Sequence, residues 1–402
     1  MKKPPRLAAV LALGLALSAC AFGQGENPAY RLAFGDPRYK NQTVDVAPGQ
    51  IFAKDSGKAI LFERMILELK PASFVYIGET HDSLPMHELQ ARVIEALYEQ
   101  ERRLAVGLEM VPADRQEALS LWSLGVLTEE DFLRQTRWHT GWGFSFAYYR
   151  PVFAYAKAHG IPLYAIDAPR DVVVQLRMRD GEVLTEEGKL APLKPDPADA
   201  EPRLMVRMAL ESLDTMAAFK GPGLDLIFEE LFKAQAARDA DISAHAIRAQ
   251  KKEDGMVVIL VGSGHVFYGF GLDRRIRQLS GLPSKSIVAV VIPKGRPSVT
   301  ISRSLADYLV GIPEEERPAY PSIGLSFTAA PDSSGLVIAR KPSSGAAQGG
   351  DFEPGDIVLS VDGRAFADAE ELMAYLAGIA WGGEIRFRLL RRGEERAVIL
   401  NL

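Results

Sequence analysis

Polar side chains able to do acid–base or metal chemistry follow four short apolar runs in this 402-residue sequence. They are Glu79 with His81 after residues 74–77, Glu109 after 104–108, Asp167 after 163–166 and His265 after 256–261. Taken singly, each is explained equally well as a helix cap or as a group that satisfies loop backbone. His81 and His265, however, both follow glycines, where a ligand can approach the backbone closely. We therefore interpret the two imidazoles together as part of a functional site.

The apolar runs that precede these residues predict an α/β fold. Each run is short, rich in β-forming residues and typical of a buried strand, and a fifth run spans residues 287–292. Stretches with helical spacing separate the runs, which predicts a mostly parallel sheet with helices on both faces. Because parallel strands end at one edge of a sheet, we expect His81 and His265 to face each other across one crevice.

A second unusual stretch spans residues 138–155, where eight of 18 residues are aromatic against 8% in the whole chain. One interpretation is a loop whose rings fold back onto the core. The other is a wall for a flat apolar ligand, with a phenol available to coordinate it. Tyr149 within this stretch, and Tyr268 three residues after His265, are the candidate phenols.

The N-terminus resembles a bacterial lipoprotein signal. Three basic residues precede an apolar run at 7–19, which is too short to span a membrane and ends at Cys20, the only cysteine. Lipidation of Cys20 would anchor the protein to a membrane. A plain secretory signal with an incidental cysteine is the alternative. Ala21 stands where an Asp commonly marks inner-membrane retention, so we expect a lipid-anchored protein at the outer membrane, most simply facing the periplasm.

Length and composition indicate a two-domain globular protein that does not bind nucleic acid. A chain of 402 residues exceeds one ordinary domain, and a net charge of −5 without a basic run offers no electrostatic footprint for nucleic acid. We expect a signal peptide at 1–20, a tether at 21–50, the main domain at 51–311, a linker at 312–321 and a second domain at 322–402. Within the main domain, a helix is expected at 59–70 and an exposed insertion at 180–203.

Three motifs of the main domain resemble the ChaN-type haem-binding lipoproteins. They are Gly78-Glu79-Thr80-His81-Asp82 through His87, Tyr149-Arg150-Pro151 leading to Ala165-Ile166-Asp167-Ala168-Pro169, and Gly262-Ser263-Gly264-His265-Val266-Phe267-Tyr268-Gly269. The resemblance implies haem as cofactor, a role in iron uptake, an outer-membrane haem receptor as partner and a homodimer as one form. It implies a haem site made from His81, His87, Tyr149, Arg150, His265 and Tyr268. Tyr149, or else Tyr268, is then the expected axial ligand, because a tyrosinate oxygen suits ferric haem.

The same signature also resembles relatives that do chemistry, so an enzyme remains the alternative to a transport protein. Erythromycin esterases and Tiki-type metalloproteases resemble this core. In that interpretation Glu79, His81, Glu109 and His265 would activate water, either as general bases or as ligands of a divalent metal. No His-Glu-x-x-His motif is present to support a zinc protease. The transport protein is the first expectation, the hydrolase the second and a purely scaffolding lipoprotein the third.

The C-terminal residues resemble a bacterial PDZ domain, a small α+β module. Several motifs occur in the expected order, including Ile323-Gly324-Leu325-Ser326-Phe327, Glu353-Pro354-Gly355-Asp356 and Ser360-Val361-Asp362-Gly363. Asp368 is expected to cap a helix, and Arg392-Gly393 to turn a hairpin. PDZ domains bind the C-terminal end of a peptide by adding it as a strand. The expected peptide site comprises Gly324, Leu325, Ser326, Phe327, Leu372 and Leu376. A spacer or a dimer contact is the alternative use.

Overall fold

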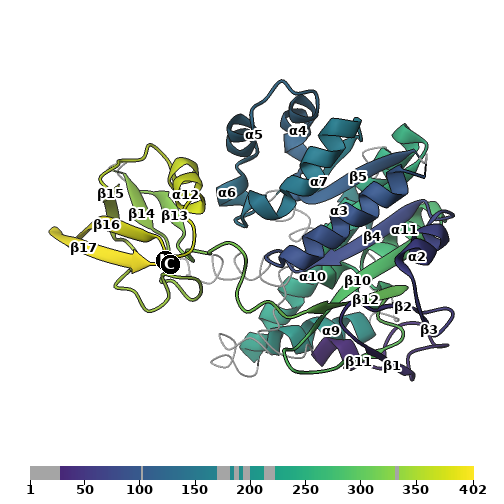
Figure 1. Ribbon diagram of the computed structural model, residues 1–402. Coiled ribbons are helices and arrows are strands. Elements are labelled where there is room, and N and C mark those ends of the chain that lie inside the picture. Colours follow the sequence, from purple (N-terminus) through teal and green to yellow (C-terminus); the bar gives the residue numbers. More distant parts are fainter. Residues whose placement is uncertain are drawn as a thin grey trace.

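The computed structural model describes residues 28–100, 103–169, 182–184, 190–192, 200–211, 222–330 and 335–402. These residues form a large α/β domain and a small C-terminal domain, which Figure 1 shows side by side. Cys20 and the rest of the expected signal peptide lie outside the described residues. Most of the expected insertion at 180–203 does as well, apart from the short pair β7 (Glu182–Leu184) and β8 (Leu190–Pro192) and the start of α9 (Ala200–Glu211).

The main sheet has eight strands among the described residues. Their order is β3 (Lys58–Ile60), β2 (Ile51–Ala53), β12 (Tyr308–Pro313), β10 (Ser284–Ile292), β4 (Phe74–Glu79), β9 (Met256–Gly262), β5 (Leu104–Pro112) and β6 (Leu163–Asp167). The strands from β12 to β6 are parallel to their neighbours, whereas β2 and β3 run antiparallel. The α/β class, the mostly parallel sheet and all five expected strands are therefore confirmed.

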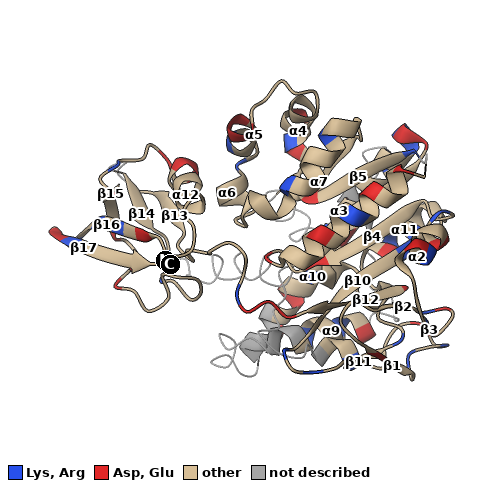
Figure 2. Cartoon of the chain, in the orientation of Figure 1, with Lys and Arg blue, Asp and Glu red and all other residues tan. Residues whose placement is uncertain are grey.

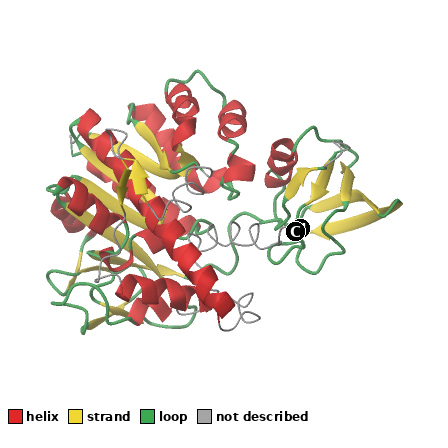
Figure 3. Cartoon of the chain, turned by 180° about the vertical axis from the view of Figure 1, so that it is seen from behind, coloured by secondary structure: helices red, strands yellow, loops and turns green. Residues whose placement is uncertain are grey.

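Helices cover both faces of this sheet because alternate strand residues bury apolar side chains on opposite sides. In β4, Val75 and Ile77 belong to one core and Phe74 and Tyr76 to the other. The first core is covered by α2 (Phe62–Leu69), α3 (Leu84–Tyr98), α4 (Gln116–Ser123), α5 (Glu129–Thr136) and α7 (Phe146–His159). The second lies under α9, α10 (Pro222–Glu253) and α11 (Leu272–Ser280), and Figure 3 shows helices across this face from behind.

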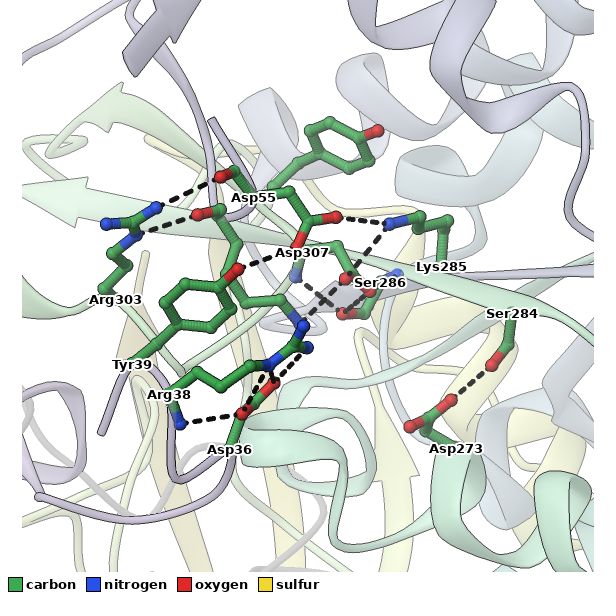
Figure 4. A network of polar contacts seen from close by, with 12 residues as sticks. Asp36, Arg38, Tyr39, Asp55, Asp273, Ser284, Lys285, Ser286, Arg303 and Asp307 are labelled. Carbon is green, nitrogen blue, oxygen red and sulfur yellow. Dashed lines mark hydrogen bonds and ion pairs between the residues drawn. The ribbon is translucent and has the colours of Figure 1, made fainter. Parts of the chain in front are cut away.

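The N-terminal residues are folded onto the domain, so the expected tether is wrong from Pro28 onward. A short 3-10 helix η1 (Pro28–Arg31) is followed by β1 (Thr43–Val46), which pairs antiparallel with β11 (Val299–Ser302). Polar contacts also tie the segment to the rest of the domain: the Arg303 guanidinium donates to the Gln42 amide oxygen at 2.7 Å, and the Tyr39 hydroxyl donates to Asp55 at 3.4 Å (Figure 4). The expected helix at 59–70 also begins later, because residues 58–60 extend the sheet edge as β3.

The C-terminal domain is a five-stranded antiparallel sheet with one helix. Its strands follow chain order: β13 (Phe327–Ala329), β14 (Leu336–Ile338), β15 (Ile357–Val361), β16 (Glu384–Arg391) and β17 (Glu394–Asn401). Helix α12 (Ala369–Ala377) begins at Asp368, whose carboxylate accepts from the Glu371 N–H at 2.9 Å. Arg392 and Gly393 both have positive φ, as a two-residue hairpin turn requires. The expected cap and turn are confirmed.

Residues of both charge signs are mixed along the described elements. Figure 2 shows acidic and basic residues interspersed along the helices and strands of both domains. No described helix combines the length and apolarity needed to cross a bilayer.

Candidate functional site

Glu79, the last residue of β4, lies at the centre of a fully buried polar cluster. One carboxylate oxygen accepts from His81 Nδ1 at 2.8 Å and from the Tyr149 hydroxyl at 2.7 Å. The other accepts from the Gln90 amide at 2.5 Å and lies 3.4 Å from His87 Nδ1. Burial by itself would raise the pKa of Glu79, but the imidazoles of His87 and His81 outweigh it and lower the pKa. Glu79 is therefore a carboxylate that orients its neighbours.

His81 is held by Glu79 through one ring nitrogen and has no partner for the other. Its side chain is 1% exposed, and within the described structure Nε2 has no hydrogen-bond partner. The rings of Trp142 and Phe144 lie beside it, with centroids 4.5 and 4.9 Å away. Leaving a buried polar atom unpaired costs about 1–3 kcal/mol, and such an atom calls for an explanation in function. Nε2 is available to bind a metal or to take up a proton.

A second buried cluster joins the ends of three other strands to helix α10. His265, in the 3-10 turn η5 (Ser263–His265) after β9, is fully buried between Asp239 at Nδ1 and Glu109 at Nε2, the latter 3.3 Å away. Glu109 also accepts from the Arg238 guanidinium at 2.9 Å and from the Gly262 N–H at 2.6 Å. The same guanidinium lies 2.9 Å from Asp167.

The charges in this second cluster shift each other's pKa. Burial would lower the pKa of His265, but Asp239 and Glu109 outweigh it and raise the pKa to about 9. Burial would raise the pKa of Glu109, but His265 and Arg238 lower it far below its ordinary value. Burial raises the pKa of Asp167 to about 6 despite the attraction of Arg238. At neutral pH the cluster holds an imidazolium and a guanidinium among carboxylates.

The two clusters form one electrostatic unit at the carboxyl edge of the sheet. β4 and β9 are hydrogen-bonded neighbours, with Glu79 paired to Gly262, and the Ser263 hydroxyl donates to the Glu79 carbonyl at 3.2 Å. Beside burial and the larger effects of His265 and Arg238, His81 also acts on Glu109 and lowers its pKa. His81 and His265 thus follow adjacent parallel strands and lie at the same edge of the sheet. This is the edge that the parallel direction of the strands predicts.

Three of the expected haem-site residues, Tyr149, Tyr268 and Arg150, have their polar groups engaged by other partners. Tyr149 is fully buried and donates to Glu79, and burial together with that carboxylate raises the pKa of its phenol well above its usual value. Tyr268 donates to the Ala29 carbonyl, so it fastens the N-terminal segment, and it lines a polar cavity of about 240 Å³ there. Arg150 is exposed and pairs with Glu129 at 2.6 Å. The expectation that Tyr149 or Tyr268 offers a tyrosinate is not supported by this geometry, because both hydroxyls are engaged as donors.

Most of the aromatic stretch packs into the first core, as the plainer interpretation predicts. Six of its rings are under a tenth exposed: Trp138, Trp142, Phe146, Tyr148, Tyr149 and Phe153. Only Trp142 and Phe144 also contact His81.

Sequence reasoning missed Gln90, Arg238 and Asp239. Arg238 and Asp239 lie in the middle of α10, where the sheet-facing stripe otherwise holds Ile242 and Ala246. A signal was present, because buried-stripe spacing in a long helix normally excludes an Arg–Asp pair. Gln90 follows His87 by three residues and so shares its helix face.

In the C-terminal domain, the expected peptide-site residues are closed off. Leu325, Phe327, Leu372 and Leu376 are all under a tenth exposed and form part of its core. Gly324 has φ +77°, and a side chain there would meet the Ser344 carbonyl, so this loop requires glycine. The Ser326 hydroxyl is buried without a partner in the described structure.

The fold and this site define a His/Glu-centred α/β protein with a peptide-binding module. The chain belongs to the family described as haem-binding uptake, Tiki superfamily, ChaN, whose model matches residues 65–276. A PDZ domain model matches residues 321–402. No curated protein matches the chain.

Several solved structures are similar to parts of this chain. A structure of cofacial haem binding to ChaN of Campylobacter jejuni has 19% identity over 65% of this chain and 95% of that chain, with a TM-score of 0.49. An erythromycin esterase EreC mutant has 15% identity over 63% and 83%, with a TM-score of 0.36. The HtrA-type protease AlgW with a decapeptide has 24% identity over 20% and 28%, with a TM-score of 0.19. Likenesses at this level say nothing about function.

A divalent metal finds no ready site. Within the described residues, no group of three or more His, Cys, Asp or Glu side chains is arranged to hold a metal ion. The metal alternative therefore gains no support from the geometry.

Proposed function

We propose that this protein binds haem at the cell envelope and serves haem or iron acquisition. Membership of the haem-binding uptake family supports the haem part. The placement rests on residues 1–20, whose basic start, apolar run and Cys20 predict lipid anchoring at the outer membrane, facing the periplasm. That placement suggests an outer-membrane haem receptor as one partner and a homodimer as one form. The PDZ domain adds a peptide or protein partner.

The observation that carries haem binding is the unpartnered Nε2 of His81. Imidazole is a ligand that haem iron accepts, and a carboxylate on the other ring nitrogen is the usual support of a metal-binding histidine. Trp142 and Phe144 place flat apolar rings beside that nitrogen. These residues fit the group: His81 would hold the iron and Glu79 would orient the ring. Haem itself would supply the iron centre.

Hydrolysis is the second candidate, because the same nitrogen suits a general base. A histidine whose Nδ1 donates to a carboxylate has Nε2 free to accept a proton from water. In this function Glu79 and His81 act as a pair, with Glu109 and His265 beside them.

A hemin titration of the chain lacking residues 1–20 tests the proposal. We expect a saturable change in the Soret band for the wild type. His81→Ala should abolish it, and Glu79→Gln should weaken hemin about 10- to 100-fold, because it removes the support of the ligand. Tyr149→Phe should keep the band if His81 is the ligand. Difference absorbance against a matched hemin blank is the measurement.

His245→Ala is the matched control, since His245 lies on α10 and pairs with Asp241 away from the site. Loss of the band in Tyr149→Phe with retention in His81→Ala would contradict the assignment of His81. If hemin gives only non-specific background and the hemin-free protein hydrolyses p-nitrophenyl esters at a rate that His81→Ala abolishes, the hydrolase replaces the transport protein.

The PDZ domain should bind peptides that end in apolar residues with a free carboxylate. We expect fluorescence anisotropy of such a peptide pool to rise on addition of the chain lacking residues 1–20. An amidated pool should bind at least about tenfold more weakly, because the loop amides lose a charged acceptor. Equal affinity for both pools would show that the loop at Gly324 does not hold a carboxylate.

A further inference from the structure

A carboxylate of the PDZ domain is bonded to the main domain. Glu370, in the first turn of α12, is 8% exposed. Its carboxylate accepts from the His139 N–H at 2.9 Å, from the Thr140 N–H at 2.8 Å and from the Thr140 hydroxyl at 2.6 Å. Asp368 supplies the cap of α12, so Glu370 is not needed for it. The bonds of Glu370 therefore fasten one domain to the other.

A second contact lies where the linker enters the PDZ domain. The Tyr320 N–H donates to the Tyr148 hydroxyl at 3.2 Å, and the two rings meet edge to face at 4.8 Å. Tyr148 in turn lies 5.5 Å from the His87 ring. Figure 1 shows α12 beside the short helix α6 (Trp138–Gly141), in agreement with these bonds. The PDZ domain is thus attached at two points near the site.

The segment that Glu370 holds is the one that covers His81. We call residues 138–144, which begin with α6, the aromatic loop. The Trp138 indole N–H donates to the Phe144 carbonyl at 2.7 Å, which ties the two ends of the loop together. Trp142 and Phe144, at its far end, contact His81. Because the loop is closed on itself, fixing α6 also fixes the two rings over His81.

The helix that carries Glu370 is also one wall of the expected peptide groove. α12 packs across β13, which pairs only with β14 among the described strands and so has an open edge. Leu372 and Leu376 of α12 are buried in the core of the domain and so form the base of that wall. A peptide that adds as a strand along β13 lies between this strand and α12, and so contacts the helix that carries Glu370. We expect this contact to shift α12 and to loosen the bonds of Glu370 to α6.

We propose that the PDZ domain is a latch that keeps the aromatic loop closed over His81, and that capture of a peptide C-terminus releases it. The latch itself stands on the Glu370 contacts, whereas what enters the opened site rests on the proposed function. The PDZ domain then regulates the site: a bound peptide shifts the population of the aromatic loop from closed towards open, whereas the peptide-free protein opens less often.

Hydrogen exchange read by mass spectrometry tests the latch without hemin. In the chain lacking residues 1–20, Glu370→Gln should make peptides covering 138–146 exchange about 10-fold faster or more, because the amide places N–H donors against backbone donors. Saturating the wild type with the free-carboxylate peptide pool should speed exchange of the same segment, and the amidated pool should not. Glu395→Gln, an exposed change on β17, is the matched control.

Thr140→Val removes the hydroxyl bond from the other side and leaves α12 untouched. It should speed exchange of 138–146 in the same direction, and the double variant should add little to Glu370→Gln. Unchanged exchange at 138–146 in both single variants would overturn the latch, as would a bound peptide that leaves this segment protected. If Glu370→Gln also speeds hydrogen exchange in β16 and α12, its effect on 138–146 is not specific, and the Thr140→Val result then decides whether the latch is correct. Absence of hemin binding would remove the proposed function and leave this result intact.

Discussion

The free energy of unfolding is expected to fall by about 3 kcal/mol as the pH rises from 6.5 to about 9. The cause is His265, whose pKa is raised from 6.5 to about 9 in the folded protein by Asp239 and Glu109, against the opposing effect of burial. A group whose pKa is raised by folding contributes its full stability below the pKa of the unfolded chain. That stability is lost as the pH climbs through the folded pKa. Chemical denaturation at a series of pH values measures it.

His265→Gln should flatten this alkaline slope, because glutamine has no proton to lose in that range. His245→Gln on α10 should leave the slope as in the wild type. The pKa of Asp167 is also raised by folding, from 3.8 to about 6, so its contribution to the free energy of unfolding is lost as the pH rises through that range. This range lies below the one in which His265 titrates. A wild-type slope between pH 6.5 and 9 that persists in His265→Gln would show that another group is responsible.

Replacing Arg238 should be among the most damaging single changes in the domain. Arg238→Met keeps most of the side-chain volume but leaves Glu109 and Asp167 without their shared cation. Breaking a buried charge pair in this way costs about 3–5 kcal/mol, since the remaining charge is stranded away from water. The measurement is the free energy of unfolding in urea at pH 7. Arg248→Met, at an exposed position of the same helix, should change it by no more than about 0.5 kcal/mol.

A compensating variant separates charge from packing. If stranded charge is the cause, Arg238→Met combined with Glu109→Gln and Asp167→Asn should recover part of the lost stability. A loss under about 1 kcal/mol in Arg238→Met alone would mean that water already reaches the carboxylates. In that case the cluster would be more open than its burial indicates.

The central residues of the candidate site could be predicted because they lie at strand ends. Chain polarity alone puts the ends of parallel strands at one edge, so Glu79, His81 and His265 had to gather there once the sheet was recognised. The same reasoning could not reach Arg238 and Asp239. The helical spacing marks the pair as unusual, but which groups Arg238 and Asp239 contact depends on how far α10 is rotated about its own axis as it packs on the sheet.

The hydrogen-bond partners of the two tyrosine hydroxyls could not be predicted from the sequence either. Tyr149 and Tyr268 are the right residue type in the right stretches, but one hydroxyl turns to Glu79 and the other to the Ala29 carbonyl. Which acceptor a phenol finds is decided by segments distant along the chain, here by 70 and 239 residues. The tether expected at 21–50 fails from Pro28 onward for the same reason, since the partners of η1 and β1 lie in the second half of the chain.

The sequence by itself determined the α/β class, the segments that form the core strands, the sheet edge at which both imidazoles lie and the presence of a PDZ domain. These follow from periodicities and motifs that act within a few residues of each other. Only the tertiary structure decided which nitrogen of His81 is left without a partner, which cation neutralises Glu109 and Asp167, and that Glu370 of one domain holds the loop of the other. Those outcomes depend on packing between segments far apart in the chain, where a shift of one residue in register or a partial turn of a helix would pair different side chains.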